Sequence, residues 1–235
     1  MLLVRNTLGG EVMDRQRVIV GITGATGTIY GVRMLELLRS VGIETHLVVS
    51  SAGEMTRACE TNLSKEDLRA LADVAYDIHD VGAAPSSGSF KTLGMVIAPC
   101  SMGTLAQIAM GTASSLLTRA ADVCLKERRR LVLMARETPL HLTHLRNMVA
   151  ATEMGAIVCP PVPAFYAKPQ TLQEMVDHTV GRVLDLFDLD VPVVKRWEGL
   201  HEPYSVTHPA EGEDLEKLNP QRFRDPRSRA NCVKR

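Results

Sequence analysis

The chain has 235 residues, of which 45% are hydrophobic, so it is long enough for one large domain with a substantial core. Lysine plus arginine and aspartate plus glutamate each number 27, which gives no reason to expect nucleic acid or an anionic membrane as partner. Five separated cysteines without a C-x-x-C pair indicate neither a zinc site nor a disulfide framework and favour a reducing cytoplasm (Cys59, Cys100, Cys124, Cys159 and Cys232).

Residues 1–16 precede the first predicted strand and are interpreted as an N-terminal extension whose apolar stretch is too short for a signal peptide. No apolar run in the sequence reaches the roughly 18 residues that a membrane-spanning helix needs. We therefore expect no membrane span.

The apolar run 17–23 predicts a buried strand, and Gly24-Ala25-Thr26-Gly27 directly after it predicts a tight turn into a helix. Such a turn exposes backbone N–H groups at a helix N-terminus, where they can bind a nucleotide phosphate. The spacing of its glycines is neither the dinucleotide fingerprint nor the nucleotide-triphosphate loop. A turn that needs glycine only for close packing of strand and helix is an equally good interpretation.

Strand and helix patterns alternate after this turn. Apolar residues at intervals of three predict a crossover helix (Ile29, Val32, Leu35 and Leu38), and further β-rich runs follow (Thr45–Ser50, Met95–Cys100, Leu131–Ala135 and Ala156–Cys159). The alternation predicts an α/β fold with a mostly parallel sheet and helices on both faces. Because ligands of such sheets bind at the carboxyl ends of the strands, the small and polar residues there are expected to share one rim.

Charged residues follow two of these elements. Arg119 and Lys126 are seven residues apart on a predicted helix, hence on nearly the same face, where they either bind one phosphate or are simply solvated. Arg136 and Glu137 follow an apolar strand, which predicts either a structural ion pair or a functional pair at the rim. In the functional case the arginine favours ionised Glu137, whereas a bound phosphate favours its protonated form.

The remaining segments give weaker signals. His141 and His144 have no third ligand at suitable spacing, so capping or packing is preferred and no metal site is predicted. Residues 84–89 and 160–169 are predicted loops, the second carrying the phenol of Tyr166. A helical pattern returns over Thr171–Phe187, and the polar residues 198–235 are interpreted as a tail, either a solvated extension or an arm on a neighbouring subunit.

Six ordered segments between Arg17 and Trp197 resemble the UbiX-type flavin prenyltransferases: Gly24–Gly27, Ser86–Ser89, Pro99–Ser101, Leu117–Arg129, Arg136–Leu142 and Pro160–Tyr166. The resemblance implies that residues 17–197 form a prenyltransferase domain with a three-layer, Rossmann-like or flavodoxin-like fold. It also implies a homo-oligomer, usually a dodecamer, with active sites between subunits. The implied reaction is metal-independent transfer of the dimethylallyl group of dimethylallyl monophosphate to N5 and C6 of reduced FMN. Its product, prenylated FMN, would serve a UbiD-type decarboxylase.

The resemblance also implies residue roles. The FMN-binding residues would be Gly24, Ala25, Thr26, Ser50, Ser101, Met102, Gly103, Thr104 and Arg136. Substrate-binding residues would be Lys126, Arg136, Tyr166 and Arg182, with Ser87, Arg119 and Trp197 beside them. Glu137 would exchange a proton with the substrate phosphate, and Glu60 and Thr26 would handle protons at the flavin.

Two departures from the family pattern bear on these roles. Thr26 stands where many members have serine, which keeps the hydroxyl but adds a methyl group, and Gly103 replaces a lysine. Neither removes a predicted phosphate ligand. A non-catalytic FMN-binding accessory subunit of a hydroxyaryl-acid decarboxylase remains the alternative, and a decarboxylase acting directly on an acid is a third hypothesis.

Overall fold

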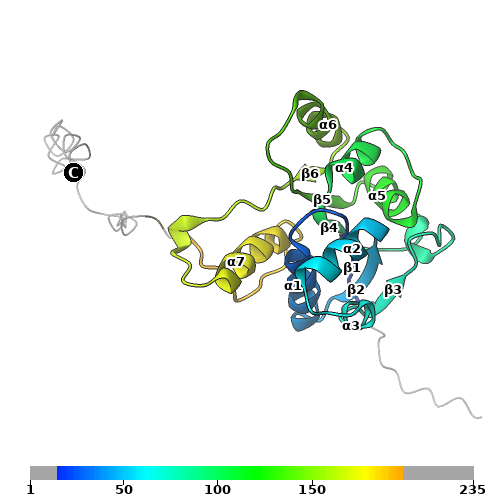
Figure 1. Cartoon of the computed structure of the whole chain (residues 1–235). Helices are drawn as coiled ribbons and strands as arrows, with labels where there is room; N and C mark the ends of the chain where they lie inside the picture. The colour runs from blue at the N-terminus through cyan, green and yellow to red at the C-terminus, as the bar shows by residue number, and fades with distance from the viewer. Residues whose placement is uncertain (1–14, 198, 200–235) are drawn as a thin grey trace, which may run out of the picture. The chain divides into compact units, whose positions relative to one another are not determined.

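The computed structural model describes residues 15–197 and 199. One sheet of six parallel strands runs through it in the order β3-β2-β1-β4-β5-β6 (Figure 1). The strands are β1 (Arg17–Ile22), β2 (Glu44–Val49), β3 (Val74–Tyr76), β4 (Gly94–Cys100), β5 (Arg130–Ala135) and β6 (Ile157–Val158). The helices are α1 (Thr28–Ser40), α2 (Ser51–Glu60), α3 (Lys65–Ala70), α4 (Met102–Ala109), α5 (Leu116–Lys126), α6 (Leu142–Glu153) and α7 (Leu172–Asp185), with 3₁₀ turns η1 (Ala84–Ser86) and η2 (Phe165–Ala167).

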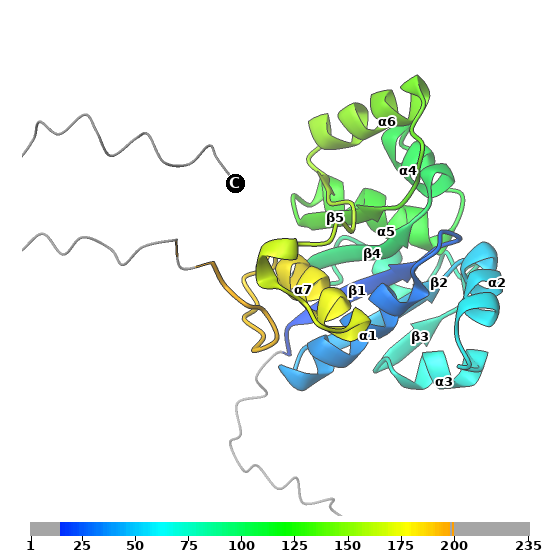
Figure 2. The same ribbon diagram turned by 60° about the vertical axis from the view of Figure 1, so that its left-hand side comes forward.

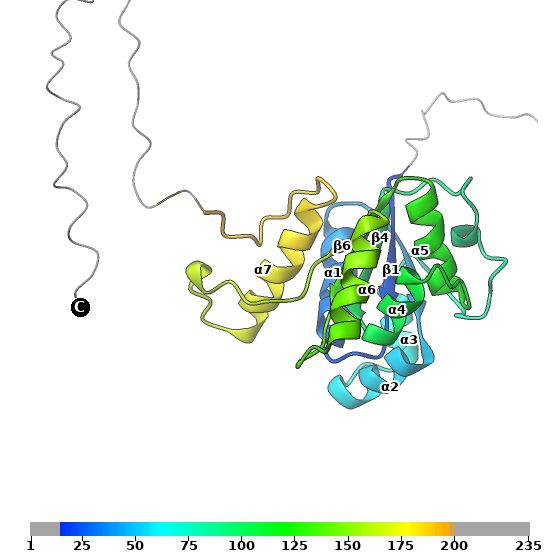
Figure 3. The same cartoon turned by 90° about the horizontal axis from the view of Figure 1, so that it is seen from above.

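The sheet separates two hydrophobic cores. Val18, Val20 and Ile22 of β1 join the core that includes α1 and α7, whereas Ile19 between them joins the core that includes α4 and α5. This alternation arises because successive side chains of a strand point to opposite faces. Viewed from above, α1 and α7 lie on one side of β1, and α4 and α5 lie on the other (Figure 3). The predicted three-layer α/β fold is therefore confirmed.

Each of the five predicted β-rich runs matches a strand to within one residue at either end, and the helix predicted over 171–187 is α7. β3 was not predicted, because its three residues are too few for a detectable pattern and are largely exposed. The two predicted loops contain η1 and η2.

The chain divides into two units between Arg196 and Trp197. Of the predicted N-terminal extension only Arg15 and Gln16 are described, and of the predicted tail only Gly199; the rest lies outside the described residues. The domain boundaries at 17 and 197 therefore stay predictions. None of the helices in the described part of the chain combines the length and the apolar character of a membrane span.

Candidate active site

Thr23 joins the ends of the two central strands. The order of the strands reverses between β1 and β4, which is where parallel α/β sheets bind ligands. The buried Thr23 hydroxyl donates to the carbonyl oxygen of Pro99 (2.9 Å) and accepts from the backbone N–H of Ser101 (2.8 Å). Thr23 is not among the predicted site residues, although its position directly after β1 is a signal that the sequence offers.

The neighbouring strand ends adjoin this point. The Ser50 N–H donates to the carbonyl oxygen of Ile22 (2.9 Å), and the Arg136 N–H donates to that of Cys100 (3.0 Å). The ends of β1, β2, β4 and β5 therefore form one rim, as predicted. Most of the predicted FMN-binding residues and both Arg136 and Glu137 belong to it.

Two helices begin at this rim, and each is capped by a serine. The Ser50 hydroxyl accepts from the Gly53 N–H (3.0 Å) at the start of α2, and the Ser101 hydroxyl accepts from the Thr104 N–H (3.2 Å) at the start of α4. The N-terminus of a helix carries partial positive charge, so both ends favour an anion at the rim. A Cβ built on Gly103 meets no atom closer than the Ser101 hydroxyl at 4.0 Å, so the first turn of α4 is open.

The glycine turn needs both of its glycines. Gly27 has a φ of 108°, which side-chain-bearing residues rarely adopt, and a Cβ built on Gly24 would overlap the Cβ of Ala52 in α2. Close packing, one of the two interpretations of this turn, is therefore part of its role.

The carboxylate of Glu60 occupies the N-terminus of α1. It accepts hydrogen bonds from the backbone N–H groups of Gly27 (2.9 Å) and Thr28 (2.9 Å) and from the hydroxyl of Thr26. Burial alone raises the pKa of Glu60, but the hydrogen bonds from Thr26, Thr28 and Gly27 outweigh it and leave the pKa below its usual value. The turn therefore binds an internal carboxylate here, rather than offering these N–H groups to a ligand phosphate.

Arg136 and Glu137 are exposed at the end of β5. The Glu137 carboxylate accepts a hydrogen bond from the Thr138 N–H (3.0 Å). Within the described residues, Arg136 and Glu137 form no ion pair with each other. Burial raises the pKa of Tyr30, and the charge of Arg136 partly offsets this, so the guanidinium lies near that phenol. The structure therefore does not support the alternative that Arg136 and Glu137 form a structural pair with each other.

A second group of predicted ligands lies along α5 and the loop before β4. Arg119 donates to the Ser86 carbonyl oxygen (3.2 Å) and pairs with Asp122 (2.6 Å), while Lys126 pairs with Glu127. Ser87 lies in the same loop, with its hydroxyl 2.9 Å from that of Ser89.

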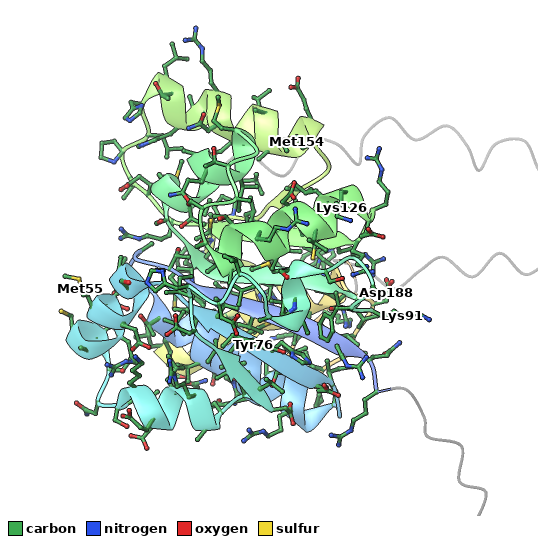
Figure 4. All side chains as sticks on the ribbon, turned by 90° about the vertical axis from the view of Figure 1, so that its right-hand side faces the viewer. Met55, Tyr76, Lys91, Lys126, Met154 and Asp188 are labelled. Carbon is green, nitrogen blue, oxygen red and sulfur yellow. The ribbon has the colours of Figure 1, made fainter. Side chains whose placement is uncertain are left out.

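Lys126 ends α5 just before β5 begins, near the amino end of the strand, whereas Arg136 follows its carboxyl end. Figure 4 shows Lys126 and Met55, which belongs to α2, on opposite sides of the view. One chain therefore does not bring Lys126 to the rim.

A third group lies on α7 and in the loop before it. The Tyr166 hydroxyl is 3.3 Å from Nε2 of His178, and Arg182 pairs with Asp185. Burial raises the pKa of the Cys159 thiol and the charge of Arg182 partly offsets it, which places this guanidinium near the end of β6. No periodic or spacing signal in the sequence marked His178. Trp197 is exposed and is the first residue of the second unit, so its role in the site stays a prediction.

The histidine pair serves a helix end. His141 caps α6 by accepting from the Thr143 N–H (3.2 Å), and its ring stacks on that of His144 with centroids 3.5 Å apart. The preferred roles of capping and packing are therefore confirmed. Within residues 15–197 and 199, no three His, Cys, Asp or Glu side chains are grouped to hold a metal ion.

The fold and the rim define a flavodoxin-like α/β protein. Its rim combines helix N-termini with an arginine and a carboxylate. Residues 10–184 match the family model named Flavoprotein. The chain is also 57% identical over 185 residues to the flavin prenyltransferase UbiX of Neisseria meningitidis serogroup B, a match that covers 79% of this chain and 98% of that protein. The chain therefore belongs to the flavoprotein family and, within it, to the UbiX-type flavin prenyltransferases.

Two solved structures have the same fold. AnUbiX (PadA1), crystallised in complex with FMN and dimethylallyl pyrophosphate, is 51% identical with a TM-score of 0.78, covering 80% of this chain and 100% of that one. The dodecameric FMN-dependent UbiX-like decarboxylase from Escherichia coli O157:H7 is 50% identical with a TM-score of 0.76, covering 78% of this chain and 100% of that one.

Proposed function

We propose that this chain is a flavin prenyltransferase, which joins the dimethylallyl group of dimethylallyl monophosphate to N5 and C6 of reduced FMN and supplies prenylated FMN to a UbiD-type decarboxylase. The observation that carries the proposal is the position of Arg136 and Glu137. They put a guanidinium, which would bind phosphate, and a carboxylate, which would exchange a proton, on the rim where α4 begins. The 51% identity to a protein crystallised with FMN and dimethylallyl pyrophosphate supports it.

The rim fits FMN, which carries a phosphate and a large planar ring system. The open first turn of α4, from Ser101 to Thr104, offers N–H groups and partial positive charge to the phosphate, and Arg136 adds a full charge. The same rim would be lined by Gly24, Ala25, Thr26 and Ser50. No metal ion is needed for this binding, because helix N–H groups and a guanidinium can neutralise the phosphate.

In the proposed reaction the allylic C–O bond breaks while reduced FMN supplies the attacking atoms. Lys126, Arg136, Tyr166 and Arg182 would bind the departing phosphate, where charged hydrogen-bond donors stabilise the negative charge that develops on it. Glu137 would exchange a proton with this phosphate. The Thr26 hydroxyl donates a hydrogen bond to the Glu60 carboxylate, so this pair could relay a proton beside the flavin.

We infer that the site is shared between subunits of a dodecamer. Arg136 follows the carboxyl end of β5 and Lys126 lies near its amino end, so two copies of the chain are needed to place both on one phosphate. The dodecameric relative from Escherichia coli supports the assembly.

We also infer that the protein works in the cytoplasm. The four described cysteines are unpaired thiols, and burial raises the pKa of Cys100 and of Cys124 to about 12. Such thiols stay protonated and are poorly reactive, in keeping with the reducing compartment that the sequence favours.

The test is an anaerobic incubation of the full chain with reduced FMN and dimethylallyl monophosphate, followed by mass spectrometry of the flavin and measurement of released phosphate. We expect FMN to gain one dimethylallyl group as phosphate appears. Bound FMN without this product would favour the accessory-subunit alternative. Release of carbon dioxide from a hydroxyaryl acid by the isolated chain would favour a decarboxylase.

A further inference from the structure

Tyr166 lies on an exposed turn but contacts a buried side chain. Phe165, its neighbour in η2, is 73% exposed and Tyr166 is 48% exposed, whereas His178 is only 7% exposed. The phenol oxygen is 3.3 Å from Nε2 of His178, and the two rings meet edge to face with centroids 5.6 Å apart and an interplanar angle of 82°. The imidazole therefore packs against the phenol ring and lies within hydrogen-bond distance of its oxygen.

His178 is a rigid support because α7 is anchored to the rest of the fold. Val176 and Val180 on this helix are buried in the core that includes α1. Asp177, adjacent to His178, pairs with Arg33 of α1 through two hydrogen bonds (2.7 and 3.3 Å). Figure 2 shows α7 lying beside α1. The packing of α7 fixes the position of the His178 imidazole, and the imidazole in turn contacts Tyr166 in the exposed turn η2.

The direction of this hydrogen bond follows from counting protons. A fully ionised phosphate only accepts hydrogen bonds, and a phenol has a single O–H group, so Tyr166 must use that group to bind the substrate. The phenol oxygen must then accept from His178, which requires a proton on Nε2.

We propose that His178 is a positioning residue for the prenyl donor: its Nε2–H donates to the Tyr166 oxygen and so directs the phenol O–H at the substrate phosphate. This proposal rests on the proposed function. It adds a residue that touches no substrate atom and acts only through Tyr166.

Two substitutions separate the hydrogen bond from the packing. His178→Phe keeps an aromatic ring and removes the donor, whereas His178→Gln loses the ring and keeps an N–H donor. A cavity of about 360 Å³, lined by His178 together with Lys168, Glu174 and Lys195, leaves room for both side chains. We expect His178→Phe to raise KM for dimethylallyl monophosphate by roughly 5- to 10-fold, as for the loss of one hydrogen bond, with KM for reduced FMN unchanged. His178→Gln should restore most of the loss.

A double-mutant cycle with Tyr166→Phe completes the test. If His178 acts through the phenol, His178→Phe added to Tyr166→Phe has no further effect on KM. An unchanged KM in His178→Phe, or additive effects in the double variant, would overturn the proposal, as would a shift in both substrates' KM values. Failure of the wild-type chain to form prenylated FMN would instead contradict the proposed function itself.

Discussion

The proposed role of Glu137 is to exchange a proton with the substrate phosphate. Replacing it with glutamine keeps the size and the hydrogen-bonding capacity of the side chain but removes its ability to exchange a proton with the substrate phosphate. We expect Glu137→Gln to bind FMN normally and to lose roughly 10²- to 10⁴-fold in the rate of prenyl transfer, the usual contribution of general acid–base catalysis. Single-turnover measurements under anaerobic conditions check this.

The matched control is Glu153→Gln, which changes an exposed glutamate at the end of α6. It should leave turnover unchanged. A Glu137→Gln variant that turns over like the wild type would refute the proton role.

Glu60 makes stability depend on pH through its bonds to the start of α1. Because its pKa is lowered in the folded state, its ionised form stabilises the fold above the ordinary value of 4.5, and this stabilisation is lost as the pH falls through the folded-state pKa. We expect Glu60→Gln to lower the free energy of unfolding at pH 7 by an amount of the order of 1 kcal/mol, typical of a helix cap.

Urea unfolding of Glu60→Gln and the wild type at a series of pH values measures this effect. The difference between them should be constant at neutral pH and shrink in acid. A difference that grows in acid would contradict the proposed cap, and Glu153→Gln should show no comparable change.

Among the elements, β1 and β4 pair directly in the sheet, and beyond this ladder the side chain of Thr23 links their carboxyl ends. Thr23→Val preserves the shape of the side chain but leaves the Ser101 N–H without its acceptor and removes one donor to Pro99. We expect a loss of about 1–3 kcal/mol in the free energy of unfolding, the cost of unsatisfied buried polar groups. Urea unfolding measures it.

The control is Thr152→Val, which removes an exposed hydroxyl bonded within α6 (2.8 Å to the Met148 carbonyl oxygen) and should cost only a few tenths of a kcal/mol. Equal losses in the two variants would show that Thr23 has no special place between the strands.

The elements also show which features of the fold and the site can be predicted from the sequence. The strand ends of β1, β4 and β5 were predictable, because long apolar runs and the parallel topology place them at one rim. The bond from Thr26 to Glu60 spans 34 residues, and that from Tyr166 to His178 joins a loop to a helix face. No local pattern encodes such contacts, since they depend on how α2 and α7 pack. The resemblance implies a functional role for Glu60, but only the fold shows that its carboxylate caps α1.

At the scale of the whole molecule, a shared site predicts that two defective chains repair each other. Lys126→Ala and Glu137→Gln should each be nearly inactive alone. When the two are co-expressed and mix at random in one oligomer, about one quarter of the sites receive both native residues, so activity should return to that extent. Turnover by the purified mixed oligomer measures this. Activity that stays at the level of the single variants would contradict a site built from two subunits.

The proposed oligomer requires contact surfaces between subunits, and the exposed apolar face of α6 is one candidate. Leu142, Leu145 and Val149 are 59%, 46% and 57% exposed and lie at helical spacing on one face. We expect Leu145→Lys to give smaller particles in light scattering and to lose turnover. Glu66→Lys on α3 adds a lysine to another helix and should leave particle size unchanged. Full-size particles from Leu145→Lys would place the contact elsewhere.

The positions of Lys126 and Arg136 at the two ends of β5 also make the activity per chain depend on the concentration of the protein. Under the shared-site proposal a lone subunit holds only part of the machinery for binding the prenyl donor. Product formation then follows the concentration of assembled particles rather than that of polypeptide, and activity per chain falls once dilution takes the protein below its assembly threshold. A cell that makes few copies of this chain would therefore make disproportionately little prenylated flavin.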